Sequence, residues 1–144
     1  MKNLSRKAED YLEAILNVFL AKGYAKTKDV ALELDVSPSS VVEMFRKLDV
    51  MGLVTYRRYE GVVLTPQGKA IAEVIKFRHD TLKRFFVFIQ VPEAIADADA
   101  CMMEHELSET SIRQIRLFMD FLDSQDFSSD MVRAFVKFYK ERAS

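Results

Sequence analysis

The feature that most constrains this fold is a succession of two short amphipathic segments and two β-rich segments in the first half of the chain. Apolar residues at helical spacing predict one helix from about Thr27 to Leu34 and a second that follows Ser37 and stops at Gly52. Ser37 can cap the second helix, and Pro38 suits its first position. Two helices joined by so tight a turn are typical of the helix-turn-helix, whose second helix can enter the DNA major groove.

Residues 53–65 predict a wing directly after that second helix. Two runs rich in Val, Thr and Tyr flank a turn at Glu60-Gly61, as in a short β-hairpin. An amphipathic helix is also predicted from Ser5 to Ala21. Together these elements predict a winged helix-turn-helix domain over residues 1–65. Such a domain can bind DNA or can serve protein contacts.

The predicted DNA contacts lie on the second helix, near its start and on the wing. Small hydroxylated residues allow close approach to the groove, so Ser39 and Ser40 are expected to meet base edges. Glu43 can accept a hydrogen bond from a cytosine amino group or stand as a solvated helix charge. The basic residues are expected to contact phosphates, which adds affinity without sequence information. The full predicted set is Lys28, Ser37, Ser39, Ser40, Glu43, Lys47, Arg57 and Arg58.

The charge is distributed unevenly along the chain. The formal net charge is -1, yet residues 1–90 hold 15 Lys and Arg against 11 Asp and Glu, and residues 91–144 hold 6 against 11. A basic front part is expected to meet an anion, while an acidic rear part has another task. This asymmetry favours DNA binding by the front part.

The rear part, residues 66–144, predicts an all-helical domain in a mainly α chain. A long helix from Pro66 towards Gln90 should cross from the first domain into the second, and helices are expected over 93–107, over 108–122 and from about 129 onward. The Phe and Met side chains exceed what these helices can bury among themselves. This excess favours a two-fold homodimer over an entirely intramolecular core.

Six side chains of metal-binding types stand in three separated places. Cys101, Glu104 and His105 occupy positions i, i+3 and i+4, which project from one face of a helix. A partly buried thiol beside a surface ion pair would explain any one of them alone. Together they offer the oxygen, nitrogen and sulfur donors that suit a first-row divalent ion. The candidate ligands are Asp10, Glu13, His79, Cys101, Glu104 and His105.

The sequence lacks the motifs that mark several classes of enzyme and membrane protein. Glu104-His105 lacks the second histidine of the zincin signature, and the chain has no Gly-rich phosphate loop and no nucleophile elbow. No apolar run reaches the roughly 18 to 20 residues of a membrane span, and the first residues lack a secretory signal. We therefore expect a cytoplasmic protein that is not an enzyme and has no membrane partner and no small-molecule substrate.

With these residues placed, the chain resembles the diphtheria toxin repressor family of metal-dependent transcriptional regulators, in particular its shorter manganese-transport-regulator branch. The resemblance implies a winged helix, a helical domain for dimerisation and metal binding, and operator binding by the metal-loaded dimer. The motifs that carry it are Glu9-Asp-Tyr-Leu-Glu13, Val36-Ser-Pro-Ser-Ser-Val41, Gly61-Val-Val-Leu-Thr-Pro-Gln-Gly68, Arg78-His79 and Cys101-x-x-Glu-His105.

The resemblance also implies a role for each candidate ligand, with one departure. Manganese-type members have a glutamate where this chain has Cys101, and iron-type members pair that cysteine with a methionine where this chain has Asp10. A thiolate favours Fe(II), Zn(II) or Co(II), whereas carboxylates on the first helix favour Mn(II). We expect Mn(II) or Fe(II), with Zn(II) as a third candidate. The remaining ligands implied by the family are Glu13, His79, Glu104 and His105.

The sequence thus predicts a metal-dependent DNA-binding regulator, a repressor of metal-uptake genes. Two alternatives stay open. One is a metal-independent winged-helix regulator that senses a small organic ligand among its Phe and Met side chains. The other is a helical metal-binding protein without a DNA role. Metal chelation separates the first alternative from the prediction, and salt-dependent DNA affinity separates the second.

Overall fold

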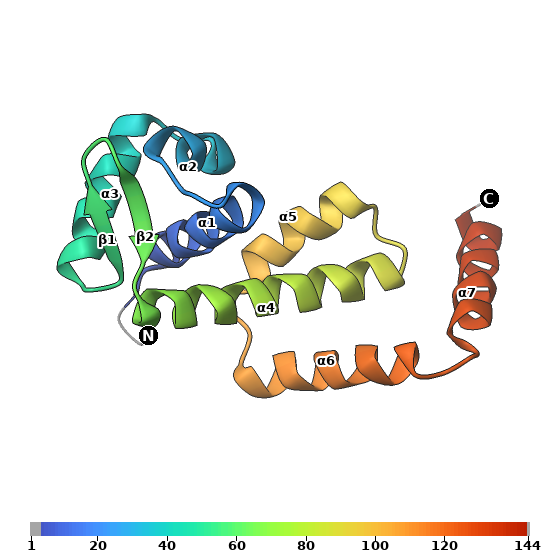
Figure 1. Ribbon diagram of the computed structural model, residues 1–144. Coiled ribbons are helices and arrows are strands. Elements are labelled where there is room, and N and C mark those ends of the chain that lie inside the picture. Colours follow the sequence, from blue (N-terminus) through green and yellow to red (C-terminus); the bar gives the residue numbers. More distant parts are fainter. Residues whose placement is uncertain (1–3, 144) are drawn as a thin grey trace. The chain divides into compact units, whose positions relative to one another are not determined.

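The computed structural model describes residues 4–143, which form helices α1 to α7 and one two-stranded sheet (Figure 1). The chain divides into two compact units, the first ending at Lys76 and the second beginning at Phe77. The long helix α4 (Pro66–Phe88) contains this boundary. The predicted fold class, a mainly α chain with a winged helix-turn-helix followed by helices, is confirmed.

Three helices make up most of the first unit: α1 (Arg6–Lys22), α2 (Thr27–Leu34) and α3 (Pro38–Val50). The Ala8 N–H donates to Ser5 Oγ at the start of α1, and Gly23 ends this helix with a left-handed φ of 81°. Ser37 caps α3 as predicted, because its Oγ accepts the Ser40 N–H at 3.2 Å. These local signals explain why the sequence could be divided into helices here.

The wing consists of β1 (Val54–Arg57) and β2 (Gly61–Leu64), paired antiparallel with Arg57 opposite Gly61. Its turn comprises residues 58–60 and not the predicted Glu60-Gly61, since Gly61 is already the first residue of β2. The Val62 N–H donates to the Ala25 carbonyl at 2.9 Å, which ties the wing to the loop before α2. At Gly61, with φ 107°, a Cβ would lie 2.5 Å from that carbonyl oxygen, so only glycine allows this approach.

One hydrophobic core holds α3 and the wing in place. The Phe45 ring of α3 lies 5.5 Å from the Tyr56 ring of β1, centroid to centroid. α3 therefore buries one face against the wing and its neighbouring helices and leaves the opposite face to solvent (Figure 1). The largest fully buried side chains of this core are Tyr11, Leu12, Ile15, Val30, Val41, Phe45, Leu48 and Val54.

The second unit contains the rest of α4 together with α5 (Glu93–Met103), α6 (Glu109–Asp123) and α7 (Ser128–Ala143). Leu82, Ala100 and Ile112 from three of these helices form a small core. The helix predicted over 93–107 ends at Met103, four residues early. Residues 104–106 form a turn, and Ser108, whose Oγ accepts the Ser111 N–H at 3.2 Å, caps α6.

The last two helices expose much apolar surface. α6 exposes Leu117, Phe118 and Phe121, and no side chain of α7 is buried within the described residues. The single chain therefore leaves uncovered the apolar excess that the sequence indicated.

Candidate metal centre and nucleic-acid interface

The second unit gathers four of the six candidate ligands. α4 carries His79, α5 carries Cys101, and the turn after α5 carries Glu104 and His105. Glu104 Oε2 lies 2.8 Å from Nδ1 of His79, and Cys101 Sγ lies 3.6 Å from the same nitrogen. His105 Nε2 lies 3.3 Å from the other Glu104 oxygen, Oε1. Glu104 and Cys101 thus both neighbour the His79 imidazole, and His105 neighbours the Glu104 carboxylate. Glu104 and His105 lie in the turn after α5, so the predicted continuous helix with Cys101 is not formed.

Arg78 holds the turn that carries two of these ligands. Its Nη1 donates to the Glu104 carbonyl at 2.8 Å and to the Leu107 carbonyl at 2.6 Å. These bonds satisfy backbone acceptors that a longer α5 would have used within the helix. The guanidinium of α4 therefore helps to end α5 at this place and fixes the backbone of Glu104.

The Glu104 carboxylate has the properties of a cation ligand. Its side chain is 0% exposed. Its Oε1 accepts no hydrogen bond from the residues that the structure describes. A buried carboxylate with an unsatisfied oxygen is costly in free energy unless a cation or a proton compensates it. Two imidazoles lie beside this carboxylate, and oxygen and nitrogen donors of this kind fit a first-row divalent ion.

The two remaining candidate ligands, Asp10 and Glu13, belong to α1 in the first unit. They stand three residues apart, so both lie on one side of this helix. Glu13 is 8% exposed and is one of the few buried charged residues within 4–143, while Asp10 is half-buried. An acidic side chain is almost never this buried unless it is paired. Their role as ligands stays a prediction.

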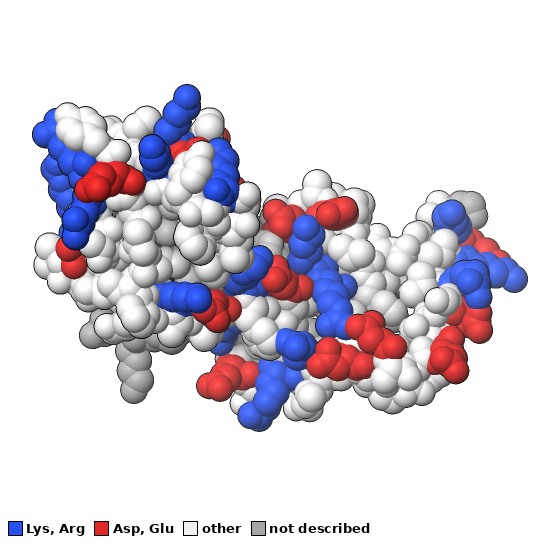
Figure 2. All heavy atoms as spheres, viewed as in Figure 1, with Lys and Arg blue, Asp and Glu red and all other residues white. Residues whose placement is uncertain are grey.

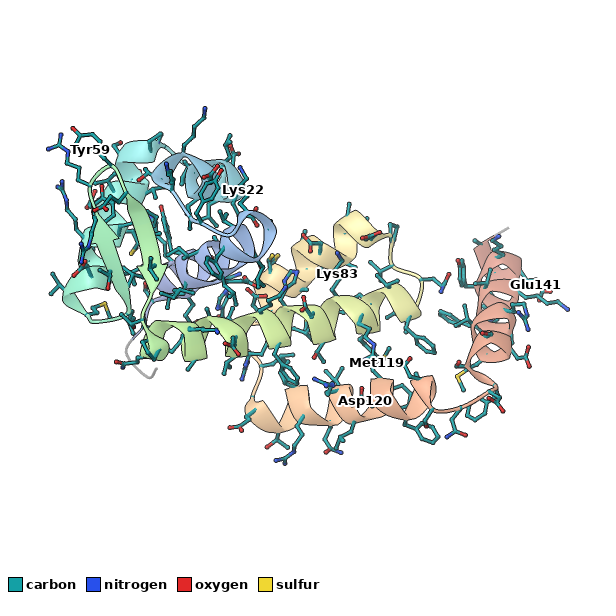
Figure 3. All side chains as sticks on the ribbon, viewed as in Figure 1. Lys22, Tyr59, Lys83, Met119, Asp120 and Glu141 are labelled. Carbon is teal, nitrogen blue, oxygen red and sulfur yellow. The ribbon has the colours of Figure 1, made fainter. Side chains whose placement is uncertain are left out.

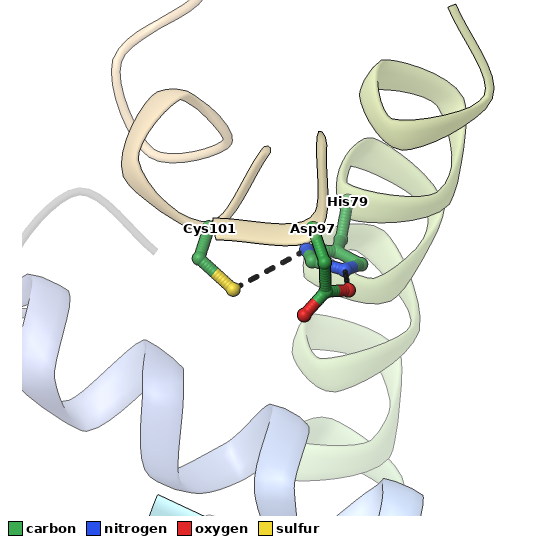
Figure 4. A group of neighbouring side chains, drawn as sticks. All are labelled: His79, Asp97 and Cys101. Atoms are coloured by element: carbon green, nitrogen blue, oxygen red, sulfur yellow. Dashed lines mark hydrogen bonds and ion pairs between the residues drawn. The ribbon is translucent and has the colours of Figure 1, made fainter. Parts of the chain in front are cut away.

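Asp97 is a residue of this centre that the sequence reasoning missed. Its Oδ1 lies 2.8 Å from Nε2 of His79, on the ring edge opposite Nδ1 (Figure 4). The hydrogen bond from His79 holds the pKa of the Asp97 carboxyl below its ordinary value. His79, Asp97 and Cys101 each offer one ligand-type atom within 4.8 Å of the others. The available signal was spacing, because Asp97 precedes Cys101 by four residues and shares its helix face.

Lys83 completes the surroundings of Asp97. This α4 side chain, labelled in Figure 3, brings Nζ to 3.6 Å from Asp97 Oδ1 and to 3.4 Å from Glu93 Oε1. Burial works to lower the pKa of Lys83, but Asp97 and Glu93 outweigh it, so the pKa is raised. Lys83 therefore stays an ammonium and keeps a positive charge beside the carboxylate that contacts His79.

The candidate DNA-contacting residues of α3 lie around its exposed amino-terminal end. Ser37 Oγ lies 2.8 Å from Ser40 Oγ and 3.2 Å from Ser39 Oγ. One helical turn later, Glu43 and Lys47 are both exposed, with 3.6 Å between Oε1 and Nζ. This surface offers hydroxyls and one salt-bridged pair to a ligand. The contacts with bases and phosphates stay predictions.

The wing and the start of α2 together form a basic hollow. Arg58 lies over the Tyr59 ring at 5.0 Å from its centroid, and Tyr59 stands at the tip of the hairpin (Figure 3). Figure 2 shows Lys and Arg side chains gathered over this end of the first unit. Lys26 is a further cation here that the prediction left out, although it stands two residues from Lys28. The hollow measures about 370 Å³ and is lined by Lys26, Thr27, Lys28, Val42, Tyr56, Arg58, Tyr59 and Gly61.

Two relatives resemble the chain over most of its length. The HTH-type transcriptional regulator MntR of Bacillus pumilus is 39% identical over 129 residues, which cover 90% of either chain. The protein of the same name from Oceanobacillus iheyensis is 41% identical over 118 residues, 82% of this chain and 80% of that one. A solved manganese-dependent transcriptional repressor in complex with manganese has a TM-score of 0.67 at 28% identity, covering 79% of this chain and 53% of its own.

Within residues 4–143, no helix combines the length and the apolar character needed to cross a bilayer.

Two family models match consecutive parts of the chain. The first describes the N-terminal DNA binding domain of iron dependent repressors and matches residues 3–62. The second describes their metal binding and dimerisation domain and matches residues 65–131. A DNA-binding domain speaks against the alternative of a metal protein without a DNA role. The chain belongs to the iron dependent repressor family of metal-dependent transcriptional regulators.

Proposed function

We propose that this protein is a repressor that takes Mn(II) or Fe(II) as its co-repressor, with Zn(II) as a third candidate, and binds double-stranded operator DNA as a homodimer. The regulated genes are those of metal uptake, as the resemblance implies. The observation that carries the proposal is the buried Glu104 carboxylate, which lies within 3.3 Å of imidazole nitrogens of both His79 and His105. Such a carboxylate needs a compensating positive charge.

The proposed ligands differ in what supports them. For His79, Glu104 and His105, support comes from the distances within the second unit. Cys101 adds an exposed thiol near His79, and this donor favours Fe(II) or Zn(II) over Mn(II). Asp10 and Glu13 are proposed from the sequence pattern, and their carboxylates favour Mn(II). When bound, the ion would supply a positive charge to the carboxylates among these ligands.

The free-energy difference that metal binding must supply to control DNA binding is modest. To change operator affinity about a hundredfold, the ion must bind the DNA-competent state about 2.7 kcal/mol more tightly than the others. Coupling free energies of this size are ordinary for allosteric proteins.

The proposal is tested by titrating DNA binding with metal. DNA fragments from the region upstream of the protein's own gene are used under reducing conditions, with Mn(II), Fe(II) and Zn(II) added in turn. We expect at least one ion to raise the affinity about a hundredfold and a chelator to reverse the effect. Equal affinity with every ion and with the chelator would contradict metal control. If the protein binds none of the fragments under any of these conditions, the proposal that this upstream region contains its operator is wrong.

On the DNA side, we propose that residues of α3 read bases and that basic residues around the hollow bind phosphates. Near the start of α3, the side chains of Ser39, Ser40 and Glu43 are exposed or half-buried. Residues that contact bases must be accessible in this way, because the helix has to come close to the floor of the major groove. Ser37 is proposed to contact a phosphate while it caps the helix. The phosphate contacts from basic side chains are Lys28, Lys47, Arg57 and Arg58, all of them exposed.

Neutralising a phosphate contact should change the salt dependence of DNA binding. We expect Lys28→Gln and Arg58→Gln each to reduce the slope of log affinity against log salt by about 1.8, because each removes two phosphate contacts from the proposed homodimer and each contact is worth about 0.9. The loss should be similar on operator and unrelated DNA. Lys140→Gln is the matched control, because it removes one positive charge from exposed α7. A slope unchanged from that of the control would remove these side chains from the interface.

A further inference from the structure

We propose that Asp97 is a positioning residue that orients His79, so that Nδ1 of the imidazole is the atom that binds the ion. The inference rests on the proposed function and deepens it, because it concerns the same metal centre. Asp97 is not among the ligands that the sequence pattern predicts. Its place is known only from the fold, which sets α5 against α4 at this point (Figure 4).

The two nitrogens of the His79 ring have different surroundings. At Nε2, Asp97 Oδ1 lies 2.8 Å away. At Nδ1, Glu104 Oε2 lies 2.8 Å away and Cys101 Sγ lies 3.6 Å away. Glu104 and Cys101, the two candidate ligands next to the ring, therefore both contact it at Nδ1. The Asp97 carboxylate contacts it at Nε2.

Each nitrogen of the His79 ring lies 2.8 Å from a carboxylate oxygen, and an ionised carboxylate can only accept hydrogen bonds. An ion held by Glu104 would take the place of a proton at Nδ1, and Asp97 would then accept the proton that the ring keeps on Nε2. A neutral ring with that proton presents the lone pair of Nδ1 towards Glu104 and Cys101. Metal-binding histidines commonly donate their second N–H to a carboxylate, which fixes the ring and strengthens the ligand. Asp97 fits this role.

Asp97 is itself held from the side by Lys83. The Nζ of Lys83 lies 3.6 Å from the same Oδ1 that accepts from His79, and 3.4 Å from Glu93. Glu93, Asp97 and Cys101 follow one another at four-residue spacing on one face of α5. The carboxylate therefore has one partner on each side, and its direction does not depend on a single contact.

The competing role for Asp97 is direct coordination together with His79 and Cys101. In that case Nε2 would carry the ion in place of its proton, since one nitrogen cannot do both. The two roles thus predict different protonated nitrogens in the loaded protein. Because the chain has only two histidines, the ring nitrogens of His79 can be resolved by spectroscopy.

The test uses the full-length variants Asp97→Ala and Asp97→Asn, with Asp99→Asn as the matched control on an exposed position of α5. Mn(II) affinity is measured by calorimetry. We expect Asp97→Ala to bind about 10- to 100-fold more weakly, and Asp97→Asn, which keeps an acceptor, to lie between it and wild type. Circular dichroism checks that the variants keep their helices. Affinities equal to that of Asp99→Asn would overturn the proposal.

A second readout concerns the ring itself. In ¹⁵N spectra of the Zn(II)-loaded wild type, we expect His79 to keep its proton on Nε2 and to show the metal-bound signal at Nδ1. A metal-bound Nε2, or the loss of one whole ion per chain in Asp97→Asn, would overturn the positioning role. If the wild type binds no ion, the proposed function itself fails, and this outcome is distinct from a wild type that binds metal regardless of residue 97.

Discussion

Replacing Glu104 with glutamine should leave the protein folded and remove the metal dependence of its DNA binding. The carboxylate is 0% exposed, and its Oε1 accepts no hydrogen bond from residues 4–143. Glutamine keeps the size of the side chain and removes the negative charge that a divalent ion would meet. We expect metal affinity to fall at least a hundredfold, which corresponds to about 2.7 kcal/mol. Calorimetry and DNA titration with and without Mn(II) measure the two effects.

The same variant also tests the stability of the metal-free protein, which the substitution should not lower. Burial of a charged carboxylate costs more than burial of a neutral amide, so the metal-free Glu104→Gln protein should unfold at the same or a higher denaturant concentration than wild type. Glu106→Gln, two residues away and exposed, is the control and should change neither property. Metal-dependent DNA binding that survives in Glu104→Gln would exclude this carboxylate from the switch.

Gly68→Ala should destabilise the first unit strongly. A Cβ at this position would lie 1.9 Å from the Leu53 carbonyl oxygen and 2.8 Å from its carbon, both of them backbone atoms. The same oxygen accepts the Thr65 N–H at 3.1 Å, so the strand that leaves the wing and the start of α4 are packed around it. Alanine would favour the helix by up to about 1 kcal/mol, but the clash should cost about 3 kcal/mol or more.

Gly23→Ala is the matched control for this prediction. Gly23 adopts φ 81° at the end of α1, and a Cβ there would meet no atom within 4 Å. Its replacement should therefore cost only the strain of the left-handed conformation, about 1 to 2 kcal/mol. Chemical denaturation of both variants gives the comparison. A Gly68→Ala protein as stable as Gly23→Ala would show that the junction between the wing and α4 can relax.

The elements that the sequence predicted well are those with local signals. Ser37 and Pro38 mark the start of α3, Gly23 marks the end of α1, and Thr65 caps α4 by accepting the Gly68 N–H at 3.1 Å. Each signal acts within a few residues of the boundary it sets. Candidate ligands could likewise be picked by residue type and helical spacing.

The elements that were missed depend on contacts between distant residues. α5 ends at Met103 where Arg78, 26 residues from Glu104, bonds the next carbonyl. Asp97 reaches His79 only because α5 packs against α4, and its four-residue spacing from Cys101 does not by itself predict this contact. The close approach of Gly61 to the Ala25 carbonyl is likewise a contact between residues distant in the chain.

The hydrogen bonds of Arg78 order the backbone of residues 104–107, and this ordering affects how the protein would bind an ion. Since the guanidinium belongs to the chain itself, the entropy of ordering this turn is lost during folding and not during chelation. We therefore expect an ion that binds Glu104 and His105 to meet a backbone that is already ordered, so this turn should need no refolding to receive it.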